Sequence, residues 1–542
     1  MTRTVGELLL IAAVVAPVVG AAVSLAGKGP PGRQCRVAAR LAWASASFAL
    51  GVAISVAVGG PFVAAVGARD GHLAFGLVAD QLTSVLLVLV CTVGAVVQSF
   101  SLRYLQADRS ASLFFVAANV VVVAMAIVCT SATALVLAAA WVVAGASFVG
   151  VIGVRRDLPG VRLAVRRTLR IFAVGDLALV AAVVVITVRA GNVDLVSAPS
   201  LHAAELHLQG VSTIVAALIV VAALVRSAQG PFGRWLPGTV SAPTPACALL
   251  HAGVVNGGAI LLVRLGALSG GSTVAMLAAF TVAALTATVA TVLVSWKPDV
   301  KGALAFSTMG QMGFMVAECA AGAYFAALVH LIGHAMYKAD LFFSSGSQVA
   351  RRGQAPVSPT TVMSGPARVV ATSATVAATL GGMAMVPGAF TNRASTVLAV
   401  FVAATAATAG WAWWRRRPMS ARMDALWVAG QLCAGAIYGL IVGGLGGWIT
   451  PALPASGIRV VNPWLLLAVA GAGALAAGLA RLDFVRRRLV AILVNAAAAP
   501  AQLEMACSGD PAGIWRAWGA SEAGGESFTE ARALASRDES AA

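Results

Sequence analysis

Hydrophobic residues form long runs along almost the whole chain, and short polar segments separate them. Most runs hold about 20 apolar residues, the length that an α-helix needs to cross roughly 30 Å of hydrocarbon. The pattern predicts an all-α, polytopic membrane helix bundle of about 15 spans, within a range of 13–16. The predicted spans cover residues 5–26, 37–58, 82–101, 112–130, 132–153, 170–189, 210–228, 245–268, 273–295, 302–319, 322–345, 369–387, 395–413, 425–449 and 463–480.

Composition supports the same class of protein. The chain has 542 residues, of which 60% are hydrophobic and 11% are charged. A soluble domain has roughly a quarter of its residues charged, so the composition excludes a soluble globular protein. The net charge is +17, from 37 Lys and Arg against 20 Asp and Glu. In a membrane protein this excess indicates topology and contact with lipid, and we expect no nucleic-acid partner.

The basic residues follow alternate spans. They follow the first, fifth, ninth, eleventh, thirteenth and fifteenth spans: Lys28, Arg33, Arg36, Arg40; Arg155, Arg156, Arg162, Arg166, Arg167; Lys297, Lys301; Arg351, Arg352; Arg415, Arg416, Arg417, Arg422; Arg481, Arg486, Arg487, Arg488. The positive-inside bias assigns these loops to the cytoplasm, so we expect the N-terminus outside and the C-terminus inside the plasma membrane. Residues 1–480 are predicted to form the transmembrane domain. Residues 481–542 are predicted to form an amphipathic and partly disordered cytoplasmic tail.

The eleventh span holds the densest set of ionisable residues. His330, His334 and Lys338 are four residues apart, so they form one stripe along a helix, with a rise of about 6 Å per step. Each such group costs roughly 2.5–3.5 kcal/mol at a span centre on insertion scales. The stripe is typical of a proton relay, because histidine titrates near neutral pH. The alternative is that these groups pair with neighbouring helices and hold the bundle together.

A second candidate lies between the seventh and eighth spans. Pro231, Pro243 and Pro245 predict a broken helix, and non-helical backbone at membrane depth indicates a polar cavity or a site buried in protein. Arg226 stays protonated and can set a local field, whereas His251 can also carry a proton.

Three further ionisable residues complete the set of candidates. Asp176 is predicted either to pair with an arginine or to gate a cation. Lys301 either belongs to the ion path or extends its amine to the membrane surface, and Asp340 is a secondary candidate beside Lys338. The seven scattered cysteines have no metal-ligand spacing, so we expect neither a metal site nor a cofactor in this chain.

Several of these segments together resemble a known family. The segments 299–314, 330–347, 226–231, 243–251 and 175–176 are similar to the antiporter-like subunits of respiratory complex I and of multisubunit cation/proton antiporters. The resemblance implies inverted repeats with broken helices, and it covers roughly residues 80–393, the predicted core.

Two segments most resemble one branch of that superfamily. Residues 249–264 and 317–340 are similar to the DabB-type subunit of energy-coupled inorganic-carbon pumps. The resemblance implies a DabA-type partner that carries zinc, and uptake of CO2 or bicarbonate driven by protons or sodium ions. Two alternatives from other classes stay open. One is a complex I-like or multisubunit antiporter subunit, and the other is a non-conducting membrane anchor that recruits a soluble enzyme through its basic loops.

The chain also departs from the antiporter pattern. The family carries a glutamate after the tryptophan of the fifth helix, but Val142 follows Trp141 here. The family's seventh-helix lysine is Arg226, and its twelfth-helix lysine falls at Asn392 or Arg393. The sequence therefore predicts that the paired carboxylate and cation of an ordinary antiporter are missing.

Overall fold

The computed structural model describes residues 2–26, 32–69, 72–155, 159–196, 198–294, 297, 299–345, 365–387, 393–414, 421–454, 468 and 471–472. Each predicted span up to residue 449 coincides with a helix or with a pair of half-helices. Within these described ranges, nine helices are long and apolar enough to cross a membrane. An all-helical, multi-span architecture is therefore confirmed.

Some predicted features lie outside the described residues. These are almost all of the span 463–480, the tail 481–542, Asn392, and the basic residues Lys28, Arg156, Arg351, Arg352 and Arg415 to Arg417. Residues 1–474 form one compact unit.

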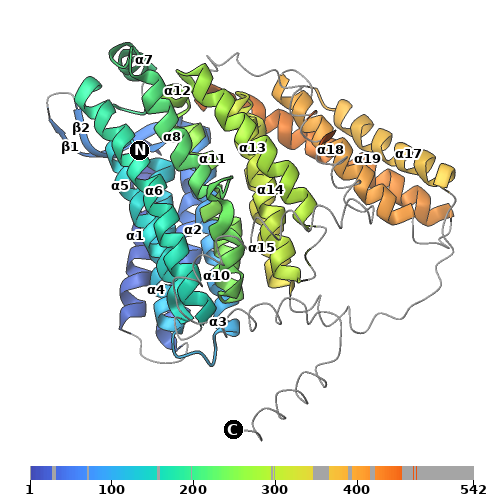
Figure 1. Ribbon diagram of the computed structural model, residues 1–542, viewed down its shortest axis with the longest axis horizontal. Coiled ribbons are helices and arrows are strands. Elements are labelled where there is room, and N and C mark those ends of the chain that lie inside the picture. Colours follow the sequence, from blue (N-terminus) through green and yellow to red (C-terminus); the bar gives the residue numbers. More distant parts are fainter. Residues whose placement is uncertain are drawn as a thin grey trace, which may run out of the picture. The chain divides into compact units, whose positions relative to one another are not determined.

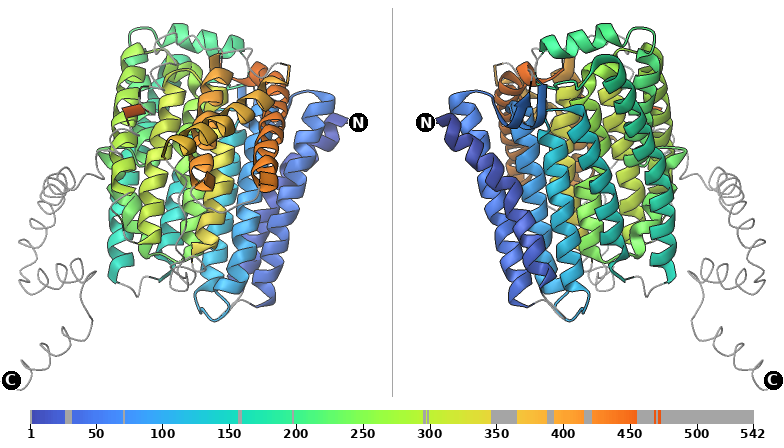
Figure 2. Two further views of the ribbon diagram at one scale, coloured as in Figure 1. Left: turned by 90° about the vertical axis from the view of Figure 1, so that its right-hand side faces the viewer. Right: turned by 90° about the vertical axis from the view of Figure 1, so that its left-hand side faces the viewer.

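The long helices of residues 2–345 run roughly side by side (Figures 1 and 2). The first half comprises α1 (Thr2–Leu25), α2 (Arg33–Gly59), β1 (Phe62–Arg69), β2 (His72–Ala79), α3 (Gln81–Tyr104), α4 (Ala111–Thr130), α5 (Ala134–Ile152), η1 (Gly153–Arg155), α6 (Pro159–Ala190) and α7 (Ala198–His207). The second half comprises α8 (Ser212–Arg226), η2 (Phe232–Arg234), α9 (Trp235–Gly238), η3 (Thr239–Ser241), α10 (Thr244–Ala252), η4 (Val254–Asn256), α11 (Gly257–Arg264), α12 (Gly266–Gly270), α13 (Thr273–Val294), α14 (Val300–Ala320) and α15 (Tyr324–Phe343).

Three more helices follow: α17 (Gly365–Ala384), α18 (Arg393–Trp414) and α19 (Ala421–Ile449), the last ending in the short turn η5 (Thr450–Ala452). α18 and α19 contact α15 through a small apolar cluster that includes Phe325, Leu398 and Val442, and α17 packs against α18 and α19. α15 also packs against α10 and α14, so the residues of the eleventh predicted span face two other helices.

A β-hairpin lies between α2 and α3, where the sequence predicted only a loop. β1 and β2 pair antiparallel, with Phe62 opposite Ala79, and the hairpin lies at the same end of the bundle as α7 (Figure 1). The Phe62 ring is buried against α1 at Gly6, where an added Cβ would come within 2.7 Å of the ring. Glycine at position 6 therefore leaves room for the Phe62 ring, and the hairpin packs against α1 through β1.

The helices around the predicted break are short. α8 ends at Arg226, and the next helix longer than four residues, α10, begins at Thr244. Pro243 precedes α10 in an extended conformation, and Pro245 lies in its first turn, where a missing N–H costs nothing. A second interruption occurs at Gly253, where an added Cβ would meet the Leu249 carbonyl oxygen at 2.7 Å. The segment is thus two half-helices, α10 and α11, joined by η4.

Candidate functional site

The stripe on α15 faces α14. The Lys338 side chain is 1% exposed, and its Nζ donates to Ser307 Oγ at 2.9 Å and to the Leu304 carbonyl oxygen at 3.4 Å. His334 is also buried, and neither of its ring nitrogens has a hydrogen-bond partner among the described residues. The His330 and His334 ring centroids are 6.4 Å apart. The predicted helical stripe is therefore present, but only Lys338 and His330 have polar partners on α14.

His330 lies between two oxygen atoms of α14. Its Nδ1 is 3.0 Å from Glu318 Oε2, and its Nε2 is 2.7 Å from Gln311 Oε1. Glu318 is fully buried and was not among the residues selected from the sequence. The spacing could have indicated it: Glu318 follows Gln311 by seven residues, close to two helical turns, so the two side chains lie on one face of α14.

His251 joins this group from α10. It is fully buried, its ring stacks on Phe342 of α15 with centroids 4.5 Å apart, and neither ring nitrogen has a hydrogen-bond partner in the described part of the chain. Burial of an unpaired imidazole lowers the free energy of unfolding, because both ring nitrogens lose their hydrogen bonds to water. The packing of α10 on α15 thus brings together ionisable groups that are distant in the sequence.

The other predicted residues of this region have different surroundings. The Lys301 Nζ is 3.5 Å from the carbonyl oxygen of Ala242, which precedes Pro243 in the broken segment. Lys301 is half-buried in the first turn of α14, and its side chain extends to the broken segment between α8 and α10. Asp340 is exposed on α15, on a different face from the buried stripe.

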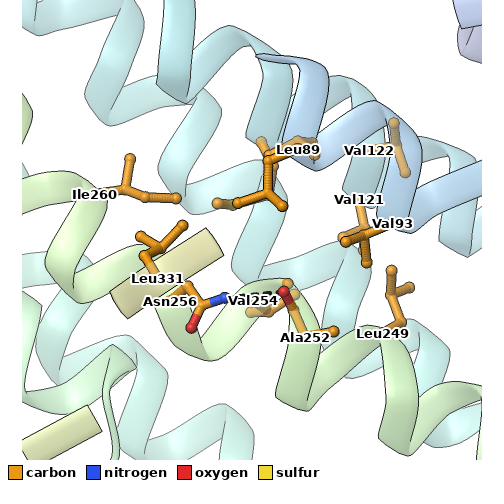
Figure 3. Close-up of a pocket in the computed structure, with 13 residues that line it drawn as sticks. Leu89, Val93, Val121, Val122, Leu249, Ala252, Val254, Asn256, Ile260 and Leu331 are labelled. Atoms are coloured by element: carbon orange, nitrogen blue, oxygen red, sulfur yellow. Dashed lines mark hydrogen bonds between the residues drawn. The ribbon is translucent and has the colours of Figure 1, made fainter. Parts of the chain in front are cut away.

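A small cavity of about 20 Å³ lies beside the interruption at Gly253 (Figure 3). Leu89, Val93 and Leu331 are among its apolar lining residues, and Asn256 contributes an amide. The volume is enough for about one water molecule, and the Asn256 Oδ1 atom has no other partner in the described structure. The cavity is therefore apolar apart from the Asn256 amide.

A second cluster surrounds Arg226 at the end of α8. Arg226 Nη2 donates to Asp176 Oδ1 of α6 at 2.8 Å and to the Trp141 carbonyl oxygen at 3.3 Å. The guanidinium carbon lies 4.2 Å from the Trp141 ring centroid and 4.5 Å from that of Phe172. An added Cβ at Gly145 of α5 would come within 2.9 Å of Arg226 Nη2. Glycine at this position therefore leaves room for the ion pair.

This geometry gives Arg226 a partner that the family motif does not supply. The fifth-helix glutamate of the family is absent at Val142, but Asp176 supplies a carboxylate to Arg226 from the neighbouring helix. Asp176 was expected to pair with an arginine or to gate a cation, and it does form an ion pair. Its partner lies 50 residues away in the sequence, whereas Arg166, Arg167 and Arg170 precede it on its own helix.

A surface cleft of about 650 Å³ lies at the end of the bundle formed by the α3–α4 connection and η1. The Tyr104 hydroxyl at its edge is 3.3 Å from Thr244 Oγ1, at the start of α10. Asp108 forms an ion pair of 3.2 Å with Arg155. Partial burial opposes ionisation of Asp108, but hydrogen bonds from Ser110 and the nearby Arg155 charge together lower its pKa. The cleft thus carries paired charges and a direct contact with the broken segment.

Within the described residues, no group of three or more His, Cys, Asp and Glu side chains is arranged to hold a metal ion.

Comparison with known families places this geometry in context. Residues 131–392 match a family described as NADH:quinone oxidoreductase/Mrp antiporter, transmembrane region. Residues 66–115 match a family described as the N-terminus of chain 5 of NADH-ubiquinone oxidoreductase, complex I. The two matches contain α3, the broken segment, the α15 stripe and the Arg226 cluster.

Two curated relatives come from Halothiobacillus neapolitanus. One, named probable inorganic carbon transporter subunit DabB1, is 33% identical over 278 residues, which are 50% of this chain and 50% of the relative. The other, named probable inorganic carbon transporter subunit DabB2, is 33% identical over 359 residues, 65% of this chain and 63% of the relative. The chain therefore matches about half to just under two thirds of the length of these relatives.

A solved structure has the same fold. The Mrp complex from Dietzia sp. DQ12-45-1b contains a chain that superposes with a TM-score of 0.60 and 23% sequence identity. The superposition covers 94% of this chain and 61% of that chain.

Proposed function

Because this chain is an antiporter-like membrane subunit of the superfamily that includes complex I subunit 5 and the Mrp subunits, we propose that it is a DabB-type subunit of an inorganic-carbon uptake pump. In this proposal the chain conducts protons or sodium ions across the plasma membrane. The ion gradient drives a zinc-bearing cytoplasmic partner of DabA type that takes up CO2 or bicarbonate. The observation that carries the proposal is the 33% identity to two relatives named as inorganic carbon transporter subunits.

The ion path of the proposal runs along α15. His330, His334 and Lys338 relay the ion, and His251 connects the relay to the broken segment near Pro243. These groups support the proposal because they lie on contacting helices, and one charge that crosses 100 mV releases about 2.3 kcal/mol. That energy is enough to bias a conformational step in a partner subunit.

The other predicted residues have supporting roles. Arg226 and Asp176 set the local field as a buried pair, and Lys301 marks the entrance beside the break. The N-terminus is proposed to lie outside and the C-terminus in the cytoplasm, because the basic loops follow alternate spans.

Ion flux tests the conducting role. The full-length chain is reconstituted in liposomes with and without the partner that copurifies with it, and flux is measured under an imposed potential. His334→Ala and Lys338→Met are expected to lower the flux at least tenfold while insertion stays intact. Tyr337→Phe on the exposed side of the same helix is the matched control. Unchanged flux in both relay variants would falsify the relay.

Copurification followed by mass spectrometry and zinc analysis tests the partner. Recovery of a large zinc protein is expected. Quinone-linked subunits in its place would favour a complex I-like role and overturn the carbon pump. Absence of flux in every preparation, together with recovery of a soluble enzyme, would favour a non-conducting anchor.

A further inference from the structure

Glu318 is a buried carboxylate that the proposed relay does not use. It lies on α14 two residues before the helix ends at Ala320, and its side chain is 0% exposed. Its Oε2 atom contacts His330, whereas Oε1 is buried and has no hydrogen-bond partner among the described residues. An unpaired carboxylate oxygen in a protein interior lowers stability. A structural role as the partner of His330 accounts for Oε2 of Glu318 but not for Oε1.

The surroundings of His330 determine which of its protons can move. Gln311 Oε1 lies 2.7 Å from Nε2 and is an acceptor, so Nε2 carries a hydrogen. The exchangeable proton is therefore the one between Nδ1 and Glu318 Oε2, which are 3.0 Å apart. Gln311 keeps this arrangement in either charge state of the ring, because its own hydrogen bond does not change when the Nδ1 proton moves.

Charge balance favours a shared proton. When the proton moves from His330 Nδ1 to Glu318 Oε2, an N–H bond breaks and an O–H bond forms. The imidazolium and carboxylate then become a neutral imidazole and a neutral carboxylic acid. Both forms have zero net charge, whereas loss or gain of a proton leaves an uncompensated charge in a low-dielectric site. The pair therefore favours the state in which one proton is held between His330 Nδ1 and Glu318 Oε2.

Other titratable groups lie near the pair on α14, α15 and α19. On α15, His334 is one turn from His330, and Lys338 lies one turn further. Cys319 adjoins Glu318 on α14, and from α19 Tyr438 lies within electrostatic range of the Glu318 carboxylate. Among these groups, Glu318 is the one carboxylate, so the shared proton has no second carboxylate among them as a competing acceptor.

We propose that Glu318 and His330 together form a proton-binding site at the end of the stripe opposite Lys338, with Gln311 as the positioning residue. Lys338 and His330 are eight residues apart, a rise of about 12 Å on the helix axis. Glu318 extends this series toward the turn between α14 and α15. The site deepens the proposed function, and it rests on that function for its role in transport.

Infrared difference spectroscopy tests the site without transport. The full-length chain in lipid nanodiscs is taken through a pH step, and the carboxylic acid C=O band is recorded. A band is expected that is absent from Glu318→Gln and unchanged in Glu205→Gln, an exposed carboxylate on α7. Gln311→Leu is expected to shift the pH midpoint of this band, which a merely structural glutamine would leave in place.

Flux in liposomes tests the role of the site. Glu318→Gln is expected to lower proton flux at least tenfold, and Glu318→Asp is expected to restore part of it. A conducting wild type with equal flux in Glu318→Gln overturns the site and leaves the proposed function standing. A wild type that shows the infrared band but no flux overturns the proposed function and supports the site. No band at any pH in a folded wild type overturns the site.

Discussion

Removal of the carboxylate beside Arg226 tests whether the two groups form an energetically coupled pair. Asp176→Asn preserves the shape of the side chain but leaves the guanidinium, which is 1% exposed, without its counter-charge. Loss of one partner from a buried ion pair costs about 3–5 kcal/mol. The Asp176 side chain is 17% exposed, and the stacking of Arg226 on Trp141 and Phe172 persists, so the expected loss is nearer 2–3 kcal/mol.

A double-mutant cycle isolates the pair from other effects. Asp176→Asn, Arg226→Gln and the double variant are unfolded at equilibrium in mixed micelles, and helix content is followed by circular dichroism. We expect the double variant to be less destabilised than the sum of the single variants by about 2 kcal/mol. Arg166→Gln, an exposed residue of α6, is the control and should change stability by less than about 0.5 kcal/mol. A coupling energy below about 0.5 kcal/mol would contradict the assignment.

Two more predictions concern neighbouring sites. Gly145→Ala is expected to destabilise the chain by about 1–3 kcal/mol, because the new Cβ would lie 2.9 Å from Arg226 Nη2. The control is Gly333→Ala on α15, which should not destabilise the chain because no atom lies within 4 Å of its added Cβ. Equal shifts of the thermal unfolding midpoint in the two variants would refute the argument. Asp108 has a lowered pKa, so its hydrogen bonds from Ser110 and its pair with Arg155 should together stabilise the fold fully above pH 3.8, with the benefit lost as pH falls through the lowered value. The test is to measure the free energy of unfolding of the wild type and of Asp108→Asn at several pH values on both sides of pH 3.8. A difference in stability between the two proteins that does not change with pH would exclude the linkage.

Some site features could be predicted because they depend on spacing within one helix. His330, His334 and Lys338 are four residues apart, and any α-helix brings such residues to one face. The prolines near the break act in the same local way, because a proline limits where a helix can begin. Neither inference needs knowledge of which helices are neighbours.

The pairing partners could not be predicted in this way. The sequence indicated a missing carboxylate at Val142, because comparison with a motif considers one helix at a time. The structure pairs Arg226 with Asp176 across 50 residues, since α6 packs against α8 and Gly145 leaves the necessary space. Glu318 was missed for the same reason, because its significance depends on contact between α14 and α15.

The number, length and composition of the apolar segments by themselves determined that the chain crosses a membrane. Hydrocarbon thickness and backbone hydrogen bonding leave almost no other structure for runs of this length. Only the tertiary structure decided which ionisable groups are paired, which have no hydrogen-bond partner among the described residues, and that a hairpin packs against α1. Those outcomes depend on close packing between helix faces, which is a property of the assembled bundle and leaves little trace in the local pattern of residues.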